Sequence, residues 1–140
     1  MNILFFLIPK SQVAYVKEDD TIRQVTEKMI HHNLTAVPIL SADGRYLNTV
    51  SEGDLFRFIK NHDNMNYRAA EMTNIMAVSH ERKVDAIRYD ADINDLFDIA
   101  INQNFVPVTD DHGIFIGIIT RKAILNHFRR LAEKDEESKA

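Results

Sequence analysis

The sequence predicts an α+β protein made from two copies of one unit, each with the element order β-α-β-β-α. Residues 13–59 hold the first copy, and residues 84–128 hold the second. Pro38 and Pro107 lie 69 residues apart, and this separation aligns the second halves of the two copies. At the start of the copies the separation is 71 residues, so the second copy is slightly shorter. A repeated unit of this size cannot bury its apolar face alone, so we expect the two copies to pack on each other.

Apolar spacing and turn signals define the elements of the first copy. Apolar residues recur with helical spacing from Ile22 to Ile30, behind a capping signal at residues 19–21. Asp43-Gly44 supplies the positive φ that a tight turn requires. The expected elements are a strand at 13–16, a helix at 22–30, strands at 36–40 and 46–50, and a helix after Ser51 with Leu55, Phe56 and Ile59 on its core face.

The second copy repeats this order. A polar turn at 110–113 separates two apolar runs, and Thr120 stands where a residue that begins the last helix is expected. Between the copies, Tyr67–Met72 predicts a short helix within a loop. The expected elements of the second copy are a strand at 86–88, a helix at 93–101, strands at 106–109 and 115–119, and a last helix with Ile124, Leu125, Phe128 and Leu131 inward.

The two ends of the chain differ in character. Residues 3–8 form an apolar run that is too short for a membrane span and lacks the flanks of a signal peptide. We expect this run to pack on the core or on a dimer partner. The other end is charged and has no apolar periodicity, which predicts disorder. The predicted organisation is an N-terminal segment at 1–12, a first repeat at 13–60, a linker at 61–83, a second repeat at 84–131 and a disordered tail at 132–140.

Composition and charge narrow the class of protein. The chain has 140 residues, no cysteine and a formal net charge of −4. Disulfides, thiolate metal sites and a cysteine nucleophile are therefore excluded, and the basic surface typical of nucleic-acid binding is missing. The six histidines have no metal-ligand spacing. We expect a cytoplasmic protein that binds neither nucleic acid nor membrane.

Two motifs in each copy resemble those of the cystathionine-β-synthase (CBS) domain. The first motif is an apolar–proline step, Val37-Pro38 in one copy and Val106-Pro107 in the other. The second is a Gly-apolar-apolar-Ser/Thr-x-x-Asp segment that enters the last helix. The resemblance covers nearly the whole chain, and we expect no attached catalytic or DNA-binding domain. It implies a stand-alone, bacterial-type pair of CBS domains packed about a pseudo-twofold axis.

The second motif is incomplete in both copies. The first copy keeps Ser51 and Asp54 but has Asn48 in place of the glycine. The second copy keeps the glycine and Thr120 but has Ala123 in place of the acidic residue.

CBS domain pairs resemble sensors of adenosine ligands, with two clefts that each combine strands of one copy with the last helix of the other. By this resemblance, the first cleft contains Ala14, Leu34, Thr35 and Ala36 with Ile118, Thr120, Lys122 and Ala123. The second cleft contains Asp85, Asn104 and Phe105 with Thr49, Ser51 and Asp54.

Residue chemistry gives these positions plausible roles. An ionised carboxylate such as Asp54 accepts hydrogen bonds from both hydroxyls of a ribose. A phosphate favours a helix N-terminus, where Arg121 and Lys122 also add positive charge. Each role has a structural alternative: Ser51 to Asp54 is a capping box, Thr120 is a helix cap, and the two basic residues form a solvated turn.

The sequence therefore predicts a regulatory module, without enzymatic activity or a cofactor, that binds AMP, ADP or ATP and signals to a protein partner. Because Ala123 cannot accept a ribose hydroxyl, a cyclic di-AMP receptor is one alternative, and a ligand-free dimeric scaffold is another. A metal-dependent hydrolase is a third, but no nucleophile and base are recognisable. Apolar last helices that a thin domain cannot cover alone predict a homodimer.

Overall fold

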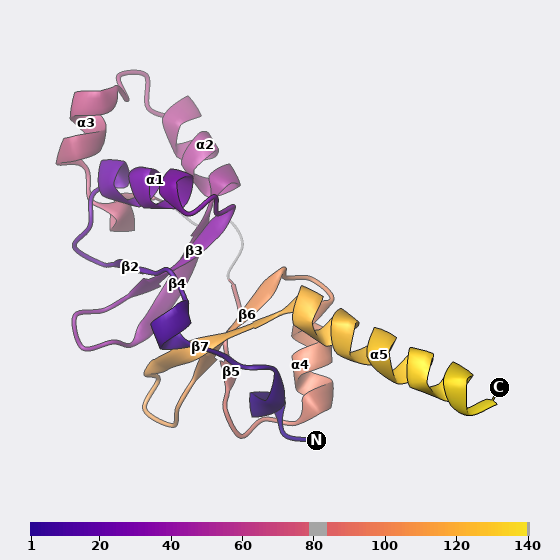
Figure 1. Cartoon of the computed structure of the whole chain (residues 1–140). Helices are drawn as coiled ribbons and strands as arrows, with labels where there is room; N and C mark the ends of the chain where they lie inside the picture. Colours follow the sequence, from indigo (N-terminus) through magenta and orange to yellow (C-terminus); the bar gives the residue numbers. More distant parts are fainter. Residues whose placement is uncertain (79–83, 140) are drawn as a thin grey trace. The chain divides into compact units, whose positions relative to one another are not determined.

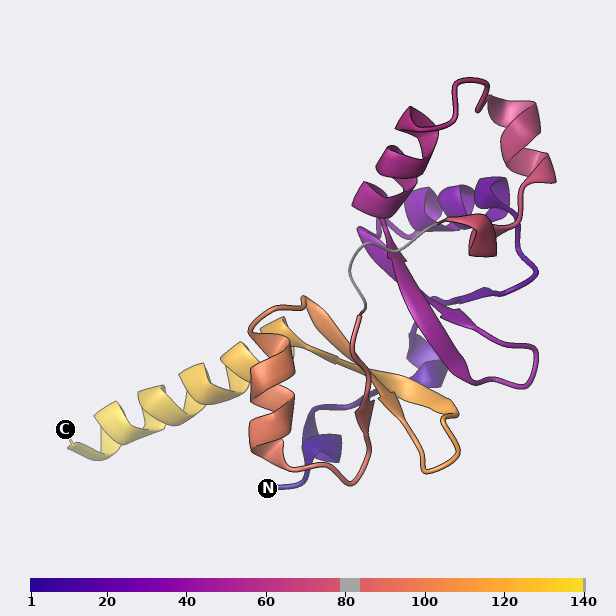
Figure 2. The same cartoon turned by 180° about the vertical axis from the view of Figure 1, so that it is seen from behind.

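A computed structural model describes residues 1–78 and 84–139 of the chain (Figures 1 and 2). The chain divides into two compact units. Residues Ala14–Val84 form the first-repeat unit, and Met1–Val13 together with Asp85–Ala140 form the second-repeat unit. Both units combine strands and helices, which confirms the predicted α+β class.

In the described part of the first-repeat unit, three strands form a sheet in the order β2-β3-β4. The pairing of β2 with β3 is parallel, and that of β3 with β4 is antiparallel, as a β-α-β-β unit requires. Its elements are β2 (Val16–Lys17), α1 (Ile22–His31), β3 (Ala36–Leu40), β4 (Tyr46–Ser51), α2 (Glu52–Lys60), α3 (Tyr67–Met72) and the 3-10 helix η3 (Ile75–Ala77).

The second-repeat unit has the same topology with one added strand. Its sheet has the order β1-β7-β6-β5, in which β5 is parallel to β6 and the other pairs are antiparallel. Its elements are the 3-10 helices η1 (Ile3–Phe6) and η2 (Lys10–Gln12), the strands β1 (Ile8–Pro9), β5 (Ile87–Arg88), β6 (Phe105–Thr109) and β7 (Phe115–Thr120), and the helices α4 (Ile93–Ala100) and α5 (Arg121–Lys139).

Each unit has its own apolar core, and the last helix of each repeat, α2 or α5, contributes less to that core than its sequence predicts. In α2, Leu55 and Phe58 are buried, whereas Phe56 and Ile59 are exposed. In α5, Ile124 is buried, but Leu125, Phe128 and Leu131 are all exposed. The prediction that these apolar residues face inward is therefore wrong for most of them, because each helix rests on its sheet along a narrow stripe.

A 3-10 helix precedes each repeat in the sequence but packs in the unit of the other repeat. Ile3 and Phe6, the first and last residues of η1, are buried in the core of the second-repeat unit. Ile75 and Val78, around η3, are buried in the core of the first-repeat unit. Asn2 and Asn74 cap the two 3-10 helices in the same way, by accepting a hydrogen bond from the second following N–H group. The repeat therefore extends further upstream than the strands predicted at 13–16 and 86–88.

This packing revises two expected segments. Residues 61–78 of the expected linker are an ordered part of the first-repeat unit, because η3 is anchored in its core; residues 79–83 lie outside the described residues. The tail expected to be disordered is helical as far as Lys139, and residue 140 lies outside the described residues. The helix continues because no glycine or proline follows Arg121 and because Leu, Ala, Glu and Lys favour helix.

Packing in the second-repeat unit explains why the second motif has a glycine, Gly117. Strand β1 crosses so close to Gly117 that a Cβ atom there would lie 2.2 Å from the Ile8 carbonyl oxygen. Asn48 occupies the equivalent position in the first-repeat unit, where β4 is the edge strand of the described sheet. The glycine is therefore required only where a strand lies against this position.

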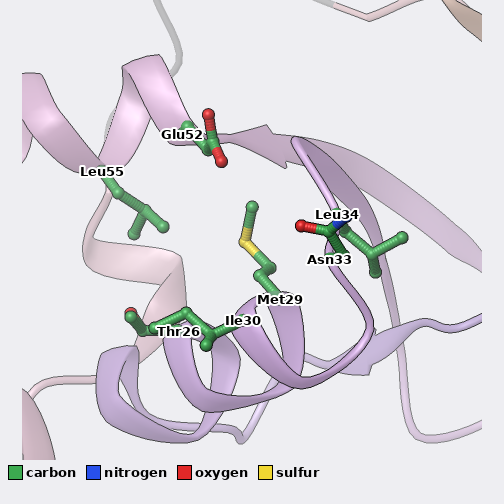
Figure 3. A pocket seen from close by; sticks show the side chains of 7 residues that line it. All are labelled: Thr26, Met29, Ile30, Asn33, Leu34, Glu52 and Leu55. Carbon is green, nitrogen blue, oxygen red and sulfur yellow. The ribbon is translucent and has the colours of Figure 1, made fainter.

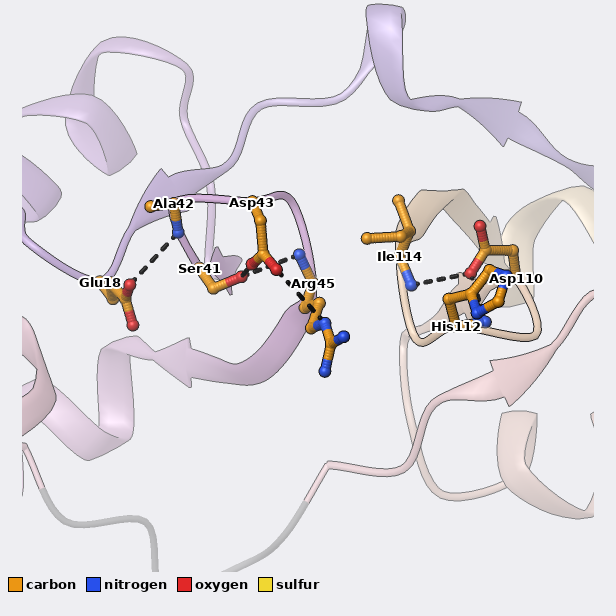
Figure 4. A network of polar contacts seen from close by, with 8 residues as sticks. All are labelled: Glu18, Ser41, Ala42, Asp43, Arg45, Asp110, His112 and Ile114. Atoms are coloured by element: carbon orange, nitrogen blue, oxygen red, sulfur yellow. Dashed lines mark hydrogen bonds and ion pairs between the residues drawn. The ribbon is translucent and has the colours of Figure 1, made fainter.

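Figure 4 shows polar contacts at the hairpin turns of the two units, and the same backbone hydrogen bond closes both turns. Ser41 N donates to Arg45 O at 2.9 Å, and Asp110 N donates to Ile114 O at 2.9 Å. Gly44 has the predicted positive φ, at 89°, and Gly113 also has a positive φ, at 80°. The Ser41 hydroxyl also donates to the carboxylate of Asp43, and this hydrogen bond is the main reason that the pKa of Asp43 is lowered. The polar turns predicted at these positions are confirmed.

Candidate ligand-binding site

In the first-repeat unit, the start of β3 lies beside the start of α2. Ala36 pairs with Ser51, and the Glu52 N–H group donates to the Thr35 carbonyl oxygen at 2.9 Å. The unit thereby gathers most of the site residues predicted within it: Leu34, Thr35, Ala36, Thr49, Ser51 and Asp54. Ala14 precedes β2, whose parallel register with β3 places it toward the same end of the sheet.

The predicted capping box is present at the N-terminus of α2. Ser51 Oγ accepts from Asp54 N at 3.1 Å, and Asp54 Oδ2 accepts from Ser51 N at 2.9 Å. The other carboxylate oxygen of Asp54 accepts from Arg57 at 2.8 Å, and the residue is only 8% exposed. Asp54 therefore stabilises the start of α2 as part of the capping box.

Thr49 has a structural partner inside its own unit. Its hydroxyl lies 2.9 Å from the Tyr46 hydroxyl, which donates to the Val84 carbonyl oxygen at 3.3 Å. Either hydroxyl group can be the donor in the contact between Thr49 and Tyr46. Because Thr49 is almost fully buried, we assign it to the support of β4.

The second-repeat unit repeats this arrangement. Phe105 pairs with Thr120, and the Arg121 N–H group donates to the Asn104 carbonyl oxygen at 2.9 Å. Thr120 Oγ1 accepts from Ala123 N at 3.0 Å, which is the predicted helix cap. The same end of the unit therefore holds five predicted residues, Asn104, Phe105, Thr120, Arg121 and Lys122, while Ile118 lies further back on β7.

Gln103 positions Asp85 in this unit, a role that the sequence pattern did not suggest. The Asp85 N–H group donates to Gln103 Oε1 at 2.8 Å. The Gln103 amide group donates in return to the carbonyl oxygens of Asp85, at 3.0 Å, and Phe105, at 3.2 Å. Gln103 thus ties the backbone before β5 to the start of β6. The only sequence signal for it is its place at the start of the repeated apolar–proline segment.

The Arg121 side chain turns away from the N-terminus of its helix and reaches the C-terminus of α4. Its guanidinium group donates to the carbonyl oxygens of Ala100, at 2.8 Å, and Ile101, at 3.1 Å, and to the Asn104 side chain at 3.3 Å. Carbonyl groups at a helix C-terminus favour a cation, so this contact stabilises the junction of α4 and α5. Lys122 is exposed and remains the basic residue with its side chain available near the N-terminus of α5.

Each unit also has a pocket between two helices, α1 and α2 in the first-repeat unit and α4 and α5 in the second-repeat unit. In the first-repeat unit the pocket has a volume of about 220 Å³, and Met29 points into the space between α1 and α2 (Figure 3). The pocket of the second-repeat unit has a volume of about 360 Å³. Of the predicted site residues, only Leu34 lines the first pocket and only Arg121 lines the second. These pockets lie within single units and differ from the predicted clefts, which combine residues of both.

Two further features limit the chemistry of the described residues. Within residues 1–78 and 84–139, no three His, Asp or Glu side chains are grouped so that they could hold a metal ion. No helix in the same ranges is long and apolar enough to cross a membrane.

Two repeats, each with a capped strand–helix junction, agree with a tandem pair of CBS domains. The sequence matches the CBS domain family over residues 7–61 and 75–130, and the chain belongs to that family.

Relatives and solved structures agree with this assignment. The chain is 24% identical over 139 residues to an uncharacterized 17.7 kDa protein of Acidianus ambivalens, which covers 94% of this chain and 80% of that protein. It is similar to CbpB in complex with c-di-AMP, with a TM-score of 0.88 and 22% identity over 99% of this chain and 91% of that chain. A CBS domain protein from Streptococcus pneumoniae has a TM-score of 0.82 and 26% identity over 91% of this chain and 86% of that chain.

Proposed function

We propose that this protein is a regulatory module that binds an adenosine nucleotide between its two CBS domains and signals its occupancy to a protein partner. One observation carries the proposal. Both units place the start of a buried strand beside the capped N-terminus of the last helix, at Thr35 and Ser51 in one and at Asn104 and Thr120 in the other. Strand backbone groups suit the amino edge of adenine, and a helix N-terminus suits phosphate.

The residue roles follow from the chemistry of each group. In the second cleft, Asp54 accepts hydrogen bonds from the ribose hydroxyls. In the first cleft, Thr120 binds the ligand by hydrogen bonds and Lys122 attracts its phosphate. Arg121 does not contact the ligand but holds α5 in position, because its guanidinium group is hydrogen-bonded to the end of α4. The cleft with Ala123 has no carboxylate at the ribose position and binds a mononucleotide more weakly.

Cyclic di-AMP is the second candidate ligand. CbpB in complex with c-di-AMP is among the solved structures similar to this chain, and CbpB of Listeria monocytogenes with c-di-AMP is another, at a TM-score of 0.80 and 17% identity. A cyclic dinucleotide has no free terminal phosphate and only one free hydroxyl on each ribose. It therefore depends less on a ribose carboxylate, which fits a cleft that has Ala123 in its place.

The remaining features of the proposal concern the whole protein. We infer that it acts by binding and not by catalysis, that it functions as a homodimer and that it works in the cytoplasm. Exposed apolar residues on the last helix of both units support self-association.

Thermal unfolding in the presence of AMP, ADP, ATP and cyclic di-AMP, one at a time, tests the ligand. A ligand at one hundred times its Kd adds about 2.7 kcal/mol of apparent stability, which raises Tm by several degrees in a protein of this size. A selective increase identifies the ligand. No increase with any of the four contradicts the proposal and favours the ligand-free scaffold.

Variants at the two helix caps then test the site. We expect Asp54→Ala and Thr120→Ala to weaken nucleotide affinity at least tenfold by calorimetric titration, since each removes one proposed contact. Asp54→Asn and Thr120→Ser keep an acceptor for the cap and separate loss of binding from loss of stability. Asp63→Ala, an exposed acidic residue on the loop after α2, is the matched control and keeps full affinity. Unchanged affinity in both alanine variants rules out this site.

A further inference from the structure

Helix α5 extends well beyond the core of its unit (Figure 1). Ile124 is the one buried residue among its described positions, and every residue from Phe128 to Lys139 is exposed. Isolated helices shorter than about 12–15 residues are marginal in water, and most helices in proteins are stabilised by tertiary packing of an apolar face. The outer half of α5 lacks such packing within its own unit.

An apolar stripe runs along the middle of this helix. Leu125, Phe128 and Leu131 follow one another at intervals of three residues and are 61%, 43% and 43% exposed. Residues separated by three or four positions share one face of a helix, so these side chains form one surface. The stripe continues the wall of the pocket between α4 and α5, which Leu125 also lines. We call this surface the α5 stripe.

The charges of α5 are divided between its two halves. Residues 121–130 contain four basic residues and no acidic one, whereas residues 131–139 contain four acidic residues and two lysines. The basic residues of the first half are Arg121, Lys122, Arg129 and Arg130, and the acidic residues of the second half are Glu133, Asp135, Glu136 and Glu137.

This order of charges does not stabilise the helix itself. The helix dipole favours acidic residues at the N-terminus and basic residues at the C-terminus, which is the reverse of the order in α5. The ion pair between Arg129 and Glu133, at 3.3 Å, also has the basic residue first, which is the weaker orientation within a helix. The division of charge therefore calls for a partner outside the helix.

We propose that α5 pairs in antiparallel orientation with α5 of a second copy of this chain. Antiparallel pairing about a twofold axis places the basic half of each helix along the acidic half of the other. It also covers the α5 stripe, which lies near the middle of the helix, with the same stripe of the second copy. A parallel pairing would instead place like charges together. This inference specifies the contact of the proposed homodimer and does not depend on the identity of the ligand.

Charge-reversed variants test the pairing by sedimentation equilibrium at low salt. The first variant carries Arg129→Glu and Arg130→Glu, and the second carries Glu133→Lys, Glu136→Lys and Glu137→Lys. We expect the wild-type protein to be a dimer, each variant alone to dimerise at least tenfold more weakly, and an equal mixture of the two to form heterodimers. Lys17→Glu with Arg68→Glu changes the net charge as the first variant does, but on the first-repeat unit, and stays dimeric.

Disulfide crosslinking tests the orientation. Because the chain has no cysteine, a single introduced cysteine reports only its own contact. In an antiparallel pair, Leu131→Cys, which lies on the α5 stripe next to the helix midpoint, crosslinks two copies under mild oxidation, and Lys139→Cys at the helix end does not. Efficient crosslinking at both positions, a monomeric wild-type protein, or full dimerisation of both charge-reversed variants overturns the proposal. Nucleotide-induced thermal shifts measured on the same variants report on the proposed ligand site separately.

Discussion

Positions 48 and 117 are equivalent in the two repeats, but only the second is glycine. Gly117 lies under β1, which leaves no space for a Cβ atom, whereas Asn48 lies on the edge strand of its described sheet. The sequence suggests that the first copy has lost the glycine of the motif. Packing explains this difference, because only position 117 lacks space for a Cβ atom.

We expect Gly117→Ala to lower the free energy of unfolding by about 2–3 kcal/mol, because the added methyl group collides with the Ile8 carbonyl oxygen and displaces β1. Gly113→Ala is the control: its φ is also positive, but nothing lies within 4 Å of the new Cβ atom, so the cost is only the backbone strain of about 1–2 kcal/mol. Urea denaturation compares the two. A smaller loss at Gly117 than at Gly113 contradicts the close approach of β1.

At the scale of elements, one side chain joins α5 to α4. Arg121→Ala removes three hydrogen bonds, two of them to carbonyl groups at the end of α4, and we expect a loss of about 1.5–3 kcal/mol in the free energy of unfolding. Arg121→Lys keeps the charge but not the planar fork and should recover only part of this loss. Lys122→Ala should leave stability within about 0.5 kcal/mol and weaken nucleotide binding. Equal effects of Arg121→Ala and Lys122→Ala on stability contradict this division of roles.

The elements that the sequence predicts well are those with local signals. The hairpin turns depend on Gly44 and Gly113, and the starts of α2 and α5 depend on Ser51 and Thr120, each within a few residues of its partner. The start of the strand and the start of the last helix of each repeat lie together because backbone hydrogen bonds join Glu52 to Thr35 and Arg121 to Asn104.

Features that depend on distant contacts were not predictable. The role of Arg121 requires the end of α4, about twenty residues earlier in the chain, to lie beside the start of α5. The outward position of Leu125 and Phe128 depends on how far α5 extends past its sheet. Apolar periodicity identifies the face of a helix but does not state whether its own unit or another chain covers that face.

At the scale of the whole molecule, each of the 3-10 helices η1 and η3 packs in the unit of the repeat that does not follow it in the sequence. The 3-10 helix before the first repeat supplies Ile3 and Phe6 to the core of the second-repeat unit. The unit therefore consists of two segments, Met1–Val13 and Asp85–Ala140, that are distant in sequence. The first-repeat unit, by contrast, is one continuous segment, because η3 follows it directly in the chain.

This difference between the units predicts which part of the chain folds as a separate fragment. A fragment of residues 14–84 contains the whole core of its unit and should show a cooperative thermal transition by circular dichroism. A fragment of residues 85–140 lacks Ile3, Phe6 and the strand β1, so it leaves a cavity in its core and an unpaired edge at β7, and we expect it to unfold without cooperativity. A peptide of residues 1–13 added at high concentration should restore the transition, and the same peptide with Ile3→Asp should not. Cooperative unfolding of the 85–140 fragment alone would mean that the N-terminal segment is dispensable for that core.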